Sequence, residues 1–198
     1  MLEMVKGCIV PDAELLFEQY EIKENEIFAN VNASKIEMVF QHFITMQDEQ
    51  LFFILELPAN EEEEKRLRFD ETSPFHKNVY YIDGLAVEQA LLILSRYGDL
   101  LINDGMSSFG FGLRDNSAEI MLHKYNMISL WTNEMDKYVD FFIKHDIPYV
   151  DRCFTAWDTF SQETPGICNS IDIEGMSVYD LPEEFKNWGI YLAEQRER

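Results

Sequence analysis

The sequence predicts an α+β fold in which a mainly antiparallel sheet packs against about four helices. Helical periods and strand-like runs are both present, but they do not alternate regularly, as a doubly wound α/β protein would require. From about Phe109 to Trp131, several strand-like runs follow one another without a helix. No long linker rich in Gly, Ser or Pro interrupts the chain. We therefore expect a single compact domain covering residues 1–198.

The first helix is predicted over residues 32–46, where apolar side chains recur at i, i+3, i+4, i+7 and i+8. Ser34 and Glu37 have the S-x-x-E spacing of a capping box, in which each side chain accepts a backbone N–H at the start of the helix. A short helix at residues 12–20 is a weaker alternative for the segment before it. The apolar run Leu51–Leu57 then predicts a central strand.

The segment Asn60–Glu71 contains four consecutive glutamates followed by three basic residues and a phenylalanine. It follows the proline that ends the predicted strand, so we interpret it as a solvated connector that contributes to the long-range field. A second strand is predicted over residues 78–83. The next helix, over residues 85–104, has one apolar face and ends near Gly105.

The middle of the chain predicts consecutive strands. Runs at residues 108–115 and 118–125 flank Asn116 and Ser117, a pattern typical of a hairpin. A further strand is predicted over residues 127–132. These three segments form the uninterrupted block of strands that favours an antiparallel sheet.

The C-terminal part predicts two helices separated by a strand. Residues 133–146 have a helical apolar period, with the first residue as the N-cap. Residues 169–175 alternate apolar and acidic side chains, which predicts a strand. The final helix is predicted over residues 180–195, where Asp180 and Glu183 repeat the capping-box spacing.

The charge of the chain is strongly negative. Asp and Glu number 37 against 16 Lys and Arg, which gives a formal net charge of −21. Such a charge repels phosphate backbones and anionic membrane surfaces, so we expect binding to neither nucleic acid nor membrane. It attracts basic proteins and cations. The alternative is that the acidity serves solubility alone.

Motifs for chemistry are missing from the sequence. Cys8, Cys153 and Cys168 are widely spaced, without the C-x-x-C of a zinc or redox motif. The sequence has no G-x-S-x-G elbow, no phosphate-binding loop followed by Lys and Ser or Thr, and no metal-ligand spacing. We therefore predict no catalytic residue, no cofactor and no metal. Without a signal-peptide pattern or an apolar run of ~18 residues, we expect a cytoplasmic protein.

The segment Thr155–Gly166 has two interpretations. In one, it is a strand end and a turn, with Trp157 filling the core. In the other, it is an exposed patch of aromatic and acidic side chains, the composition of interface hot spots. If a partner exists, acids on structured elements lose less entropy on binding than acids on a flexible run. The predicted partner-binding residues are Trp157, Asp158, Glu163, Asp172, Glu174, Glu183 and Glu184.

At "LLINDGMSSFGFG", "EIMLHKYN", "TAWDTFSQETPG" and "VYDLPEEFKNWGIYLAE" the chain resembles small acidic immunity proteins of bacterial polymorphic and contact-dependent toxin systems. The resemblance covers residues 100–194. It implies a cytoplasmic, non-enzymatic protein that neutralises a cognate toxin domain. A toxin that attacks nucleic acid is itself basic, so an acidic inhibitor suits it. Two alternatives remain: an enzyme acting on a small molecule, and an acidic adaptor for another basic protein.

Overall fold

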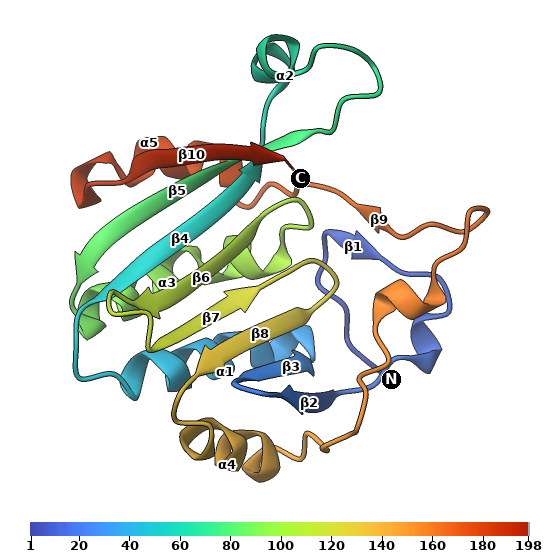
Figure 1. Ribbon diagram of the computed structural model, residues 1–198, viewed down its shortest axis with the longest axis vertical. Helices are drawn as coiled ribbons and strands as arrows, with labels where there is room; N and C mark the ends of the chain where they lie inside the picture. The colour runs from blue at the N-terminus through green and yellow to red at the C-terminus, as the bar shows by residue number, and fades with distance from the viewer. Residues whose placement is uncertain (198) are drawn as a thin grey trace.

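In the computed structural model, which describes residues 1–197, the main sheet has eight strands in the order β10-β5-β4-β6-β7-β8-β3-β2 (Figure 1). Every neighbouring pair of strands in it is antiparallel. The mainly antiparallel α+β fold is therefore confirmed. The strands are β2 (Gln19–Lys23), β3 (Glu26–Asn30), β4 (Leu51–Pro58), β5 (His76–Leu85), β6 (Ser108–Leu113), β7 (Ala118–Leu122), β8 (Met127–Thr132) and β10 (Tyr191–Glu197).

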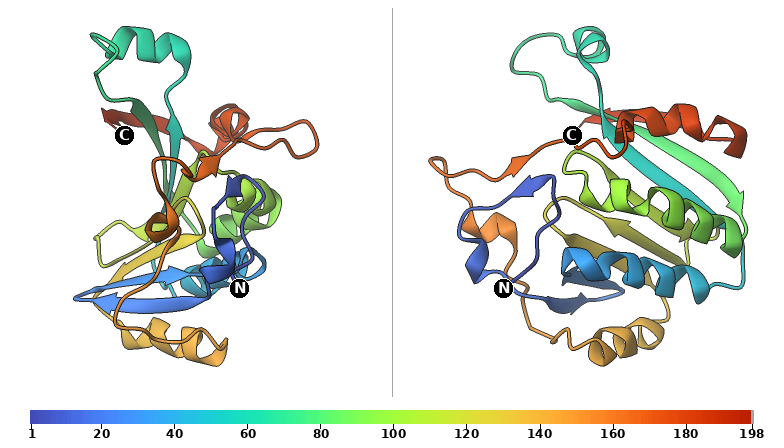
Figure 2. Two further views of the ribbon diagram at one scale, coloured as in Figure 1. Left: turned by 90° about the vertical axis from the view of Figure 1, so that its right-hand side faces the viewer. Right: turned by 180° about the vertical axis from the view of Figure 1, so that it is seen from behind.

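Helices cover only one face of this sheet. Figure 2 shows α1 and α3 lying side by side against that face, and α4 lying beyond the β2–β3 end. Buried aromatic rings fill the space between the helices and the sheet; Phe40 of α1, for example, stacks on Phe109 of β6 with ring centroids 4.8 Å apart. The helices are α1 (Ala33–Thr45), α2 (Glu61–Leu67), α3 (Val87–Asn103), α4 (Asp136–Lys144) and α5 (Leu181–Glu184). Within residues 1–197, no helix has both the length and the apolar character needed to span a membrane.

The N-terminal segment is held on the helix side by a second, two-stranded sheet of β1 (Cys8–Ile9) and β9 (Ile167–Cys168). Just before β1, the backbone of Gly7 donates to Asn103 O at 2.8 Å and accepts from Asn169 N at 2.8 Å. A Cβ at Gly7 would overlap the backbone nitrogen of Gly105 and the backbone oxygens of Asn169 and Asn103. Glycine is therefore needed here because two backbone segments approach each other closely.

The prediction of a final helix over residues 180–195 is wrong. Helix α5 ends after one turn, and a 3-10 turn at Lys186–Trp188 leads to Gly189, whose φ is +82°. The chain then forms β10, which pairs with β5 and whose residues are all exposed. The apolar residues of the first part of this segment do pack inward: Leu181 and Phe185 are buried, and Trp188 is partly buried against the core, whereas Leu192 is exposed. Pairing with an available sheet edge overrides the weak helical preference of the remaining residues.

Two further predicted elements are wrong. A 3-10 turn at Ala13–Leu15 and the β2–β3 hairpin replace the helix at residues 12–20. Residues 169–175 form no strand, since their pairing is limited to a single bridge between Ile173 and Met176.

The predicted caps also differ from those observed. At α1, Asn32 is the N-cap residue, and Ser34 Oγ instead donates to Glu3 at 2.5 Å. At α5, Asp180 accepts from Ser177 rather than capping the helix. These polar side chains are used by tertiary contacts or by a preceding turn that sequence spacing does not reveal.

Candidate partner-binding surfaces

Trp157 and Asp158 lie together on a 3-10 turn, Ala156–Thr159. Trp157 is 58% exposed, so the interpretation that it fills the core is wrong. Its ring packs edge-on against Tyr125 and Phe160, with centroid separations of 5.3 Å in both cases. This tryptophan therefore contributes an exposed aromatic surface that is partly covered by neighbouring rings.

The carboxylate of Asp158 is largely committed to its own turn. It accepts hydrogen bonds from Thr155 N at 2.8 Å and Thr155 Oγ1 at 3.1 Å, and it pairs with Arg152 at 2.5 Å. The bond from the Thr155 backbone, more than the nearby Arg152, holds the pKa of Asp158 below its ordinary value. Glu163 lies in the following turn, which is closed by the hydroxyls of Ser161 and Thr164.

The other predicted acids lie on two further segments. Asp172 accepts from Gly175 N at 2.7 Å, and Glu174, in the same turn, has a φ of 54°. Glu183 and Glu184 are exposed on α5, where Glu183 pairs with Lys186 at 2.5 Å. The seven predicted residues thus belong to four separate local elements, each held by its own short-range contacts.

The sequence prediction missed an arm formed by residues 59–75, between β4 and β5. Figure 1 shows that the arm, which carries α2, projects beyond the sheet. The segment Asn60–Glu71 does connect two strands, and none of its residues is buried, but the sequence interpretation missed that it contains an ordered, capped helix. Asn60 caps α2 by accepting from Glu62 N and Glu63 N at 3.0 Å each, and the Glu63 carboxylate accepts from Asn60 N at 2.9 Å. Acids in a first helical turn also favour the helix dipole, so N-x-x-E was an available signal.

The arm is tied to the sheet by its acidic residues. Glu64 accepts from His76 N at 2.6 Å and lies 3.1 Å from His76 Nδ1, while Glu63 accepts from Asn78 Nδ2 at 2.9 Å. Desolvation tends to raise the pKa of Glu64, but the hydrogen bonds from His76 outweigh it and leave that pKa below its ordinary value. Two of the four consecutive glutamates are therefore used to fix the helix in place.

The loop after α2, residues 68–75, has a defined conformation. Arg68 donates from Nε to Ser73 O at 2.9 Å and from Nη2 to Glu71 O at 2.6 Å, and its guanidinium lies over the Phe75 ring, 4.2 Å from the centroid.

Asp70 adds a second set of bonds within this loop. Its carboxylate accepts from the hydroxyl and the backbone of Thr72 and of Ser73, and the Thr72 hydroxyl contributes most to holding the pKa of Asp70 below its ordinary value. Between Arg68 and Asp70, the side chain of Phe69 is 99% exposed. The loop thus presents an aromatic ring to solvent from a backbone that is already ordered.

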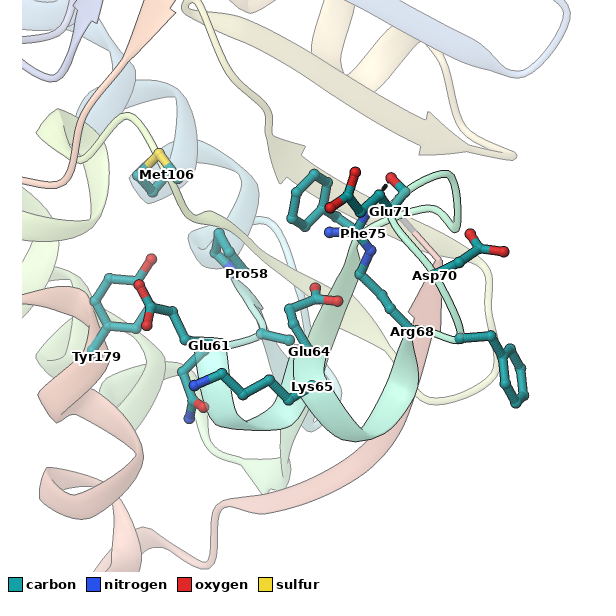
Figure 3. Close-up of a pocket in the computed structure, with 13 residues that line it drawn as sticks. Pro58, Glu61, Glu64, Lys65, Arg68, Asp70, Glu71, Phe75, Met106 and Tyr179 are labelled. Carbon is teal, nitrogen blue, oxygen red and sulfur yellow. Dashed lines mark hydrogen bonds between the residues drawn. The ribbon is translucent and has the colours of Figure 1, made fainter.

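A cleft of about 850 Å³ lies between the arm and the body of the protein. Its wall is mostly apolar and includes Pro58, Phe75, Met106 and Tyr179. Figure 3 shows Tyr179 and Met106 facing α2 across the cleft, with the Glu61 carboxylate between Tyr179 and the helix. The sequence predicted none of these apolar residues as part of a site, because they come from four separate segments of the chain.

The sheet face opposite the helices is a second candidate surface. At its centre, the buried carboxylate of Glu56 is held by Lys77 at 2.6 Å and by Arg196. Burial tends to raise the pKa of Glu56, but these cations outweigh burial and lower it. On the same face, burial and the charge of Glu56 raise the pKa of Glu119. Two aromatic rings of this face pack on each other, with the centroids of Tyr81 and Phe52 lying 5.5 Å apart.

One pair on this face resembles a nucleophile and its base. His123 Nε2 lies 2.9 Å from Ser129 Oγ, and burial lowers the pKa of His123. Nucleophilic catalysis of this kind also needs a third group that orients the base. In the part of the chain that the structure describes, no carboxylate hydrogen-bonds the other ring nitrogen of His123, and no cluster of three or more His, Cys, Asp or Glu side chains could hold a metal ion.

The three comparisons with known proteins add no relative: no family model, no curated protein and no solved structure matches this chain.

Proposed function

We propose that this chain is a non-enzymatic binding protein that captures a basic protein, and that its partner is the cognate toxin domain of a bacterial toxin–immunity pair. The observation that carries the proposal is the excess of acidic over basic residues, 37 against 16. Complementary charge accelerates encounter and disfavours wrong partners. An inhibitor that must intercept a toxin before it acts benefits from both effects.

The placement of the acids supports this proposal. Glu61 and Glu62 are exposed on the capped helix α2, and Glu183 and Glu184 are exposed on α5. Because these carboxylates belong to ordered elements, a partner that contacts them loses less conformational entropy than it would against a flexible tail. The acidic surplus is thus available both to the long-range field and to specific contacts.

Ionic strength gives the first test of this function. Raising the salt concentration from 0.05 to 0.5 M shortens the Debye length from about 14 Å to about 4 Å. If charge steers the partner, the association rate with the toxin domain falls at least about tenfold over this range, because steered rates reach 10⁸–10⁹ M⁻¹s⁻¹ only at low salt. The rate is measured by stopped-flow mixing. An association rate that does not change with salt would leave the acidity with a role in solubility only.

Co-expression gives the second test. The test takes a candidate toxin domain from a neighbouring gene and expresses it in a sensitive host, with and without the chain. Growth is expected only when both are present. The control is a catalytically inactive toxin domain, which permits growth in either case. Equal growth arrest with and without the chain would refute the proposed function.

A further inference from the structure

We propose that the arm and its cleft are the docking surface for the basic partner, and that the cleft receives an apolar side chain of the partner flanked by lysines or arginines. This inference rests on the proposed function for the sign of the partner's charge. It goes beyond that function by naming the surface and the recognised chemistry. None of the seven residues predicted from the sequence lines the cleft.

The apolar part of the argument is the exposed aromatic surface. Phe69 is 99% exposed, and Phe75 and Tyr179 on the cleft wall are also exposed. Clusters of exposed apolar side chains occur at interaction sites more often than chance would give. Arg68 and Asp70 already fix the loop that carries Phe69. A partner that covers this ring therefore pays little additional entropy to order the loop.

The negative charge of the arm indicates that the segment of the partner that docks here is basic. Between Ala59 and Phe75 the chain holds six acidic residues and three basic ones. Glu63, Glu64 and Asp70 are used within the fold, and Arg68 is bound to loop carbonyls. Among the described residues of the arm, the exposed carboxylates without such commitments are those of Glu61 and Glu71, which line the cleft, and of Glu62, which lies beside them on α2. They outnumber the exposed basic residues Lys65, which also lines the cleft, and Arg66. Lysines or arginines beside an inserted apolar side chain would lie against these carboxylates.

Two other aromatic surfaces are less suited to this role. Trp157 is already packed against Tyr125 and Phe160. On the open sheet face, Phe52 and Tyr81 pack on each other. Covering those rings removes less water-exposed surface than covering Phe69, and the gain from burial scales with the apolar area removed from water.

A peptide titration tests the docking surface without the toxin. The probe is a synthetic peptide with one leucine between flanking lysines, added to the ¹⁵N-labelled full chain and followed by NMR. Shift changes are expected at arm residues and at Met106 and Tyr179. Phe69→Ala is expected to weaken binding about tenfold or more, as truncation of an interface hot spot does. Phe17→Ala, which removes a 55% exposed ring outside the arm, is the matched control and is expected to leave affinity unchanged.

A second set of variants tests the charges. The triple variant Glu61→Gln, Glu62→Gln and Glu71→Gln is expected to weaken peptide binding and reduce its salt dependence. The control triple variant Glu14→Gln, Glu24→Gln and Glu49→Gln removes the same charge from exposed positions outside the arm. Equal weakening by both triple variants, or shift changes spread evenly over all acidic surfaces, would overturn the docking proposal.

The toxin assay separates this inference from the proposed function. If the chain fails to protect against the toxin while the peptide still docks at the arm, the proposed function falls and the docking surface stands. If the chain protects, and Phe69→Ala and the arm triple variant protect equally well at limiting expression, the docking surface falls and the function stands. Light scattering checks one other occupant: self-association of the chain that Phe69→Ala abolishes would identify a second copy and refute a basic partner there.

A separate observation carries a second inference. We infer that Cys8 and Cys168 form a disulfide when a low-molecular-weight disulfide such as oxidised glutathione is supplied. They are direct partners in the β1–β9 ladder, and their Sγ atoms lie 3.8 Å apart. The hydrogen bond from Asn169 N to Gly7 O falls on the neighbouring pair. The cysteines thus occupy a non-hydrogen-bonded position, where side chains on paired strands are closest.

The reaction balances as thiol–disulfide exchange. The thiolate of Cys168 attacks one sulfur of oxidised glutathione, forming a mixed disulfide and expelling one glutathione thiolate. The thiolate of Cys8 then attacks Cys168 Sγ, forming the protein disulfide and releasing the second glutathione. Two thiol protons leave the protein, and oxidised glutathione takes up the two electrons. Cys168 attacks first because it is less buried than Cys8. The hydrogen bond with Cys168 and burial also raise the pKa of the Cys8 thiol.

Peptide mapping tests this inference on the unmodified chain. After equilibration with oxidised glutathione, free thiols are alkylated and the digest is analysed by mass spectrometry. A peptide linking Cys8 to Cys168 is expected, with Cys153 remaining alkylatable once the chain is unfolded. Because the bond closes a separation of 160 residues, the unfolding temperature is also expected to rise on oxidation. Three alkylated cysteines, or only mixed glutathione adducts, would refute the inference; Cys153→Ser, the control, is expected to leave the linked peptide unchanged.

Discussion

Replacing Glu56 by Gln gives a sharp test of the electrostatics of the open sheet face. Glu56 is buried, and its carboxylate accepts from Lys77 Nζ at 2.6 Å and from Arg196. A hydrogen bond to a charged group contributes about 1.5–3 kcal/mol to stability. The Lys77 side chain is only 26% exposed, so its hydrogen bond to Glu56 keeps most of this stabilisation. The Arg196 side chain is 45% exposed, so solvent screening reduces its share to about 0–1 kcal/mol. We therefore expect Glu56→Gln to lower the free energy of unfolding by about 2–3 kcal/mol at pH 7.

The loss is expected to depend on pH in a defined direction. The pKa of Glu56 is lowered in the folded state from its ordinary value of 4.5. A carboxyl with a lowered folded pKa stabilises the fold above its unfolded pKa, and that contribution disappears as pH falls through the folded pKa. The difference between wild type and Glu56→Gln is thus constant above about pH 5.5 and shrinks below pH 4.5, where Glu56 of the wild type is protonated first in the unfolded state and, at lower pH, in the folded state as well.

Urea unfolding at a series of pH values measures both effects, with the slope of the transition checked for constancy. Glu119→Gln is the matched control on the same face. The pKa of Glu119 is raised by burial and by Glu56, so its ionised form costs stability as pH rises through that pKa. Glu119→Gln is therefore expected to be neutral or stabilising at pH 7. A Glu56→Gln loss under about 0.5 kcal/mol, or equal losses for the two variants, would refute the assigned role of the ion pair.

Three further changes have defined outcomes. Asn126→Ala removes a fully buried amide that hydrogen-bonds the backbone of Val5, Glu3 and Val31, so a loss of about 2–4 kcal/mol is expected in urea unfolding; a loss below about 1 kcal/mol would contradict this bonding pattern. Gly7→Ala places a methyl group against backbone atoms and is expected to cost at least about 2 kcal/mol in the same assay; wild-type stability would show that this approach is looser than described. Asn60→Ala removes the cap of α2 and is expected to speed amide hydrogen exchange in the arm while the unfolding midpoint stays within error; unchanged exchange would refute the capping role.

Local patterns of side chains were enough to predict much of the fold. The apolar periods of residues 32–46 and 85–104 predicted α1 and α3, because a helix that packs on a sheet must bury one continuous stripe. The run Leu51–Leu57 predicted β4, the central strand with neighbours on both sides. The turn at Asn116 and Ser117 predicted the β6–β7 hairpin. In each case, either the segment pairs with a segment close in sequence, or its buried face produces a regular spacing of apolar residues.

Tertiary structure decided the rest, since the determining contacts join segments distant in sequence. Residues 191–197 have no strong preference of their own, and they form a strand because the edge of β5 offers unpaired backbone groups. The composition determined that the electrostatic field around the protein is negative. Only folding decided where acidic side chains lie next to exposed apolar side chains. Pro58, Phe75, Met106 and Tyr179 converge on one cleft from separate segments. Cys8 and Cys168 become neighbours by the pairing of β1 with β9. Neither of these contacts produces a periodic pattern in the sequence, because the packing of whole elements decides which distant residues become neighbours.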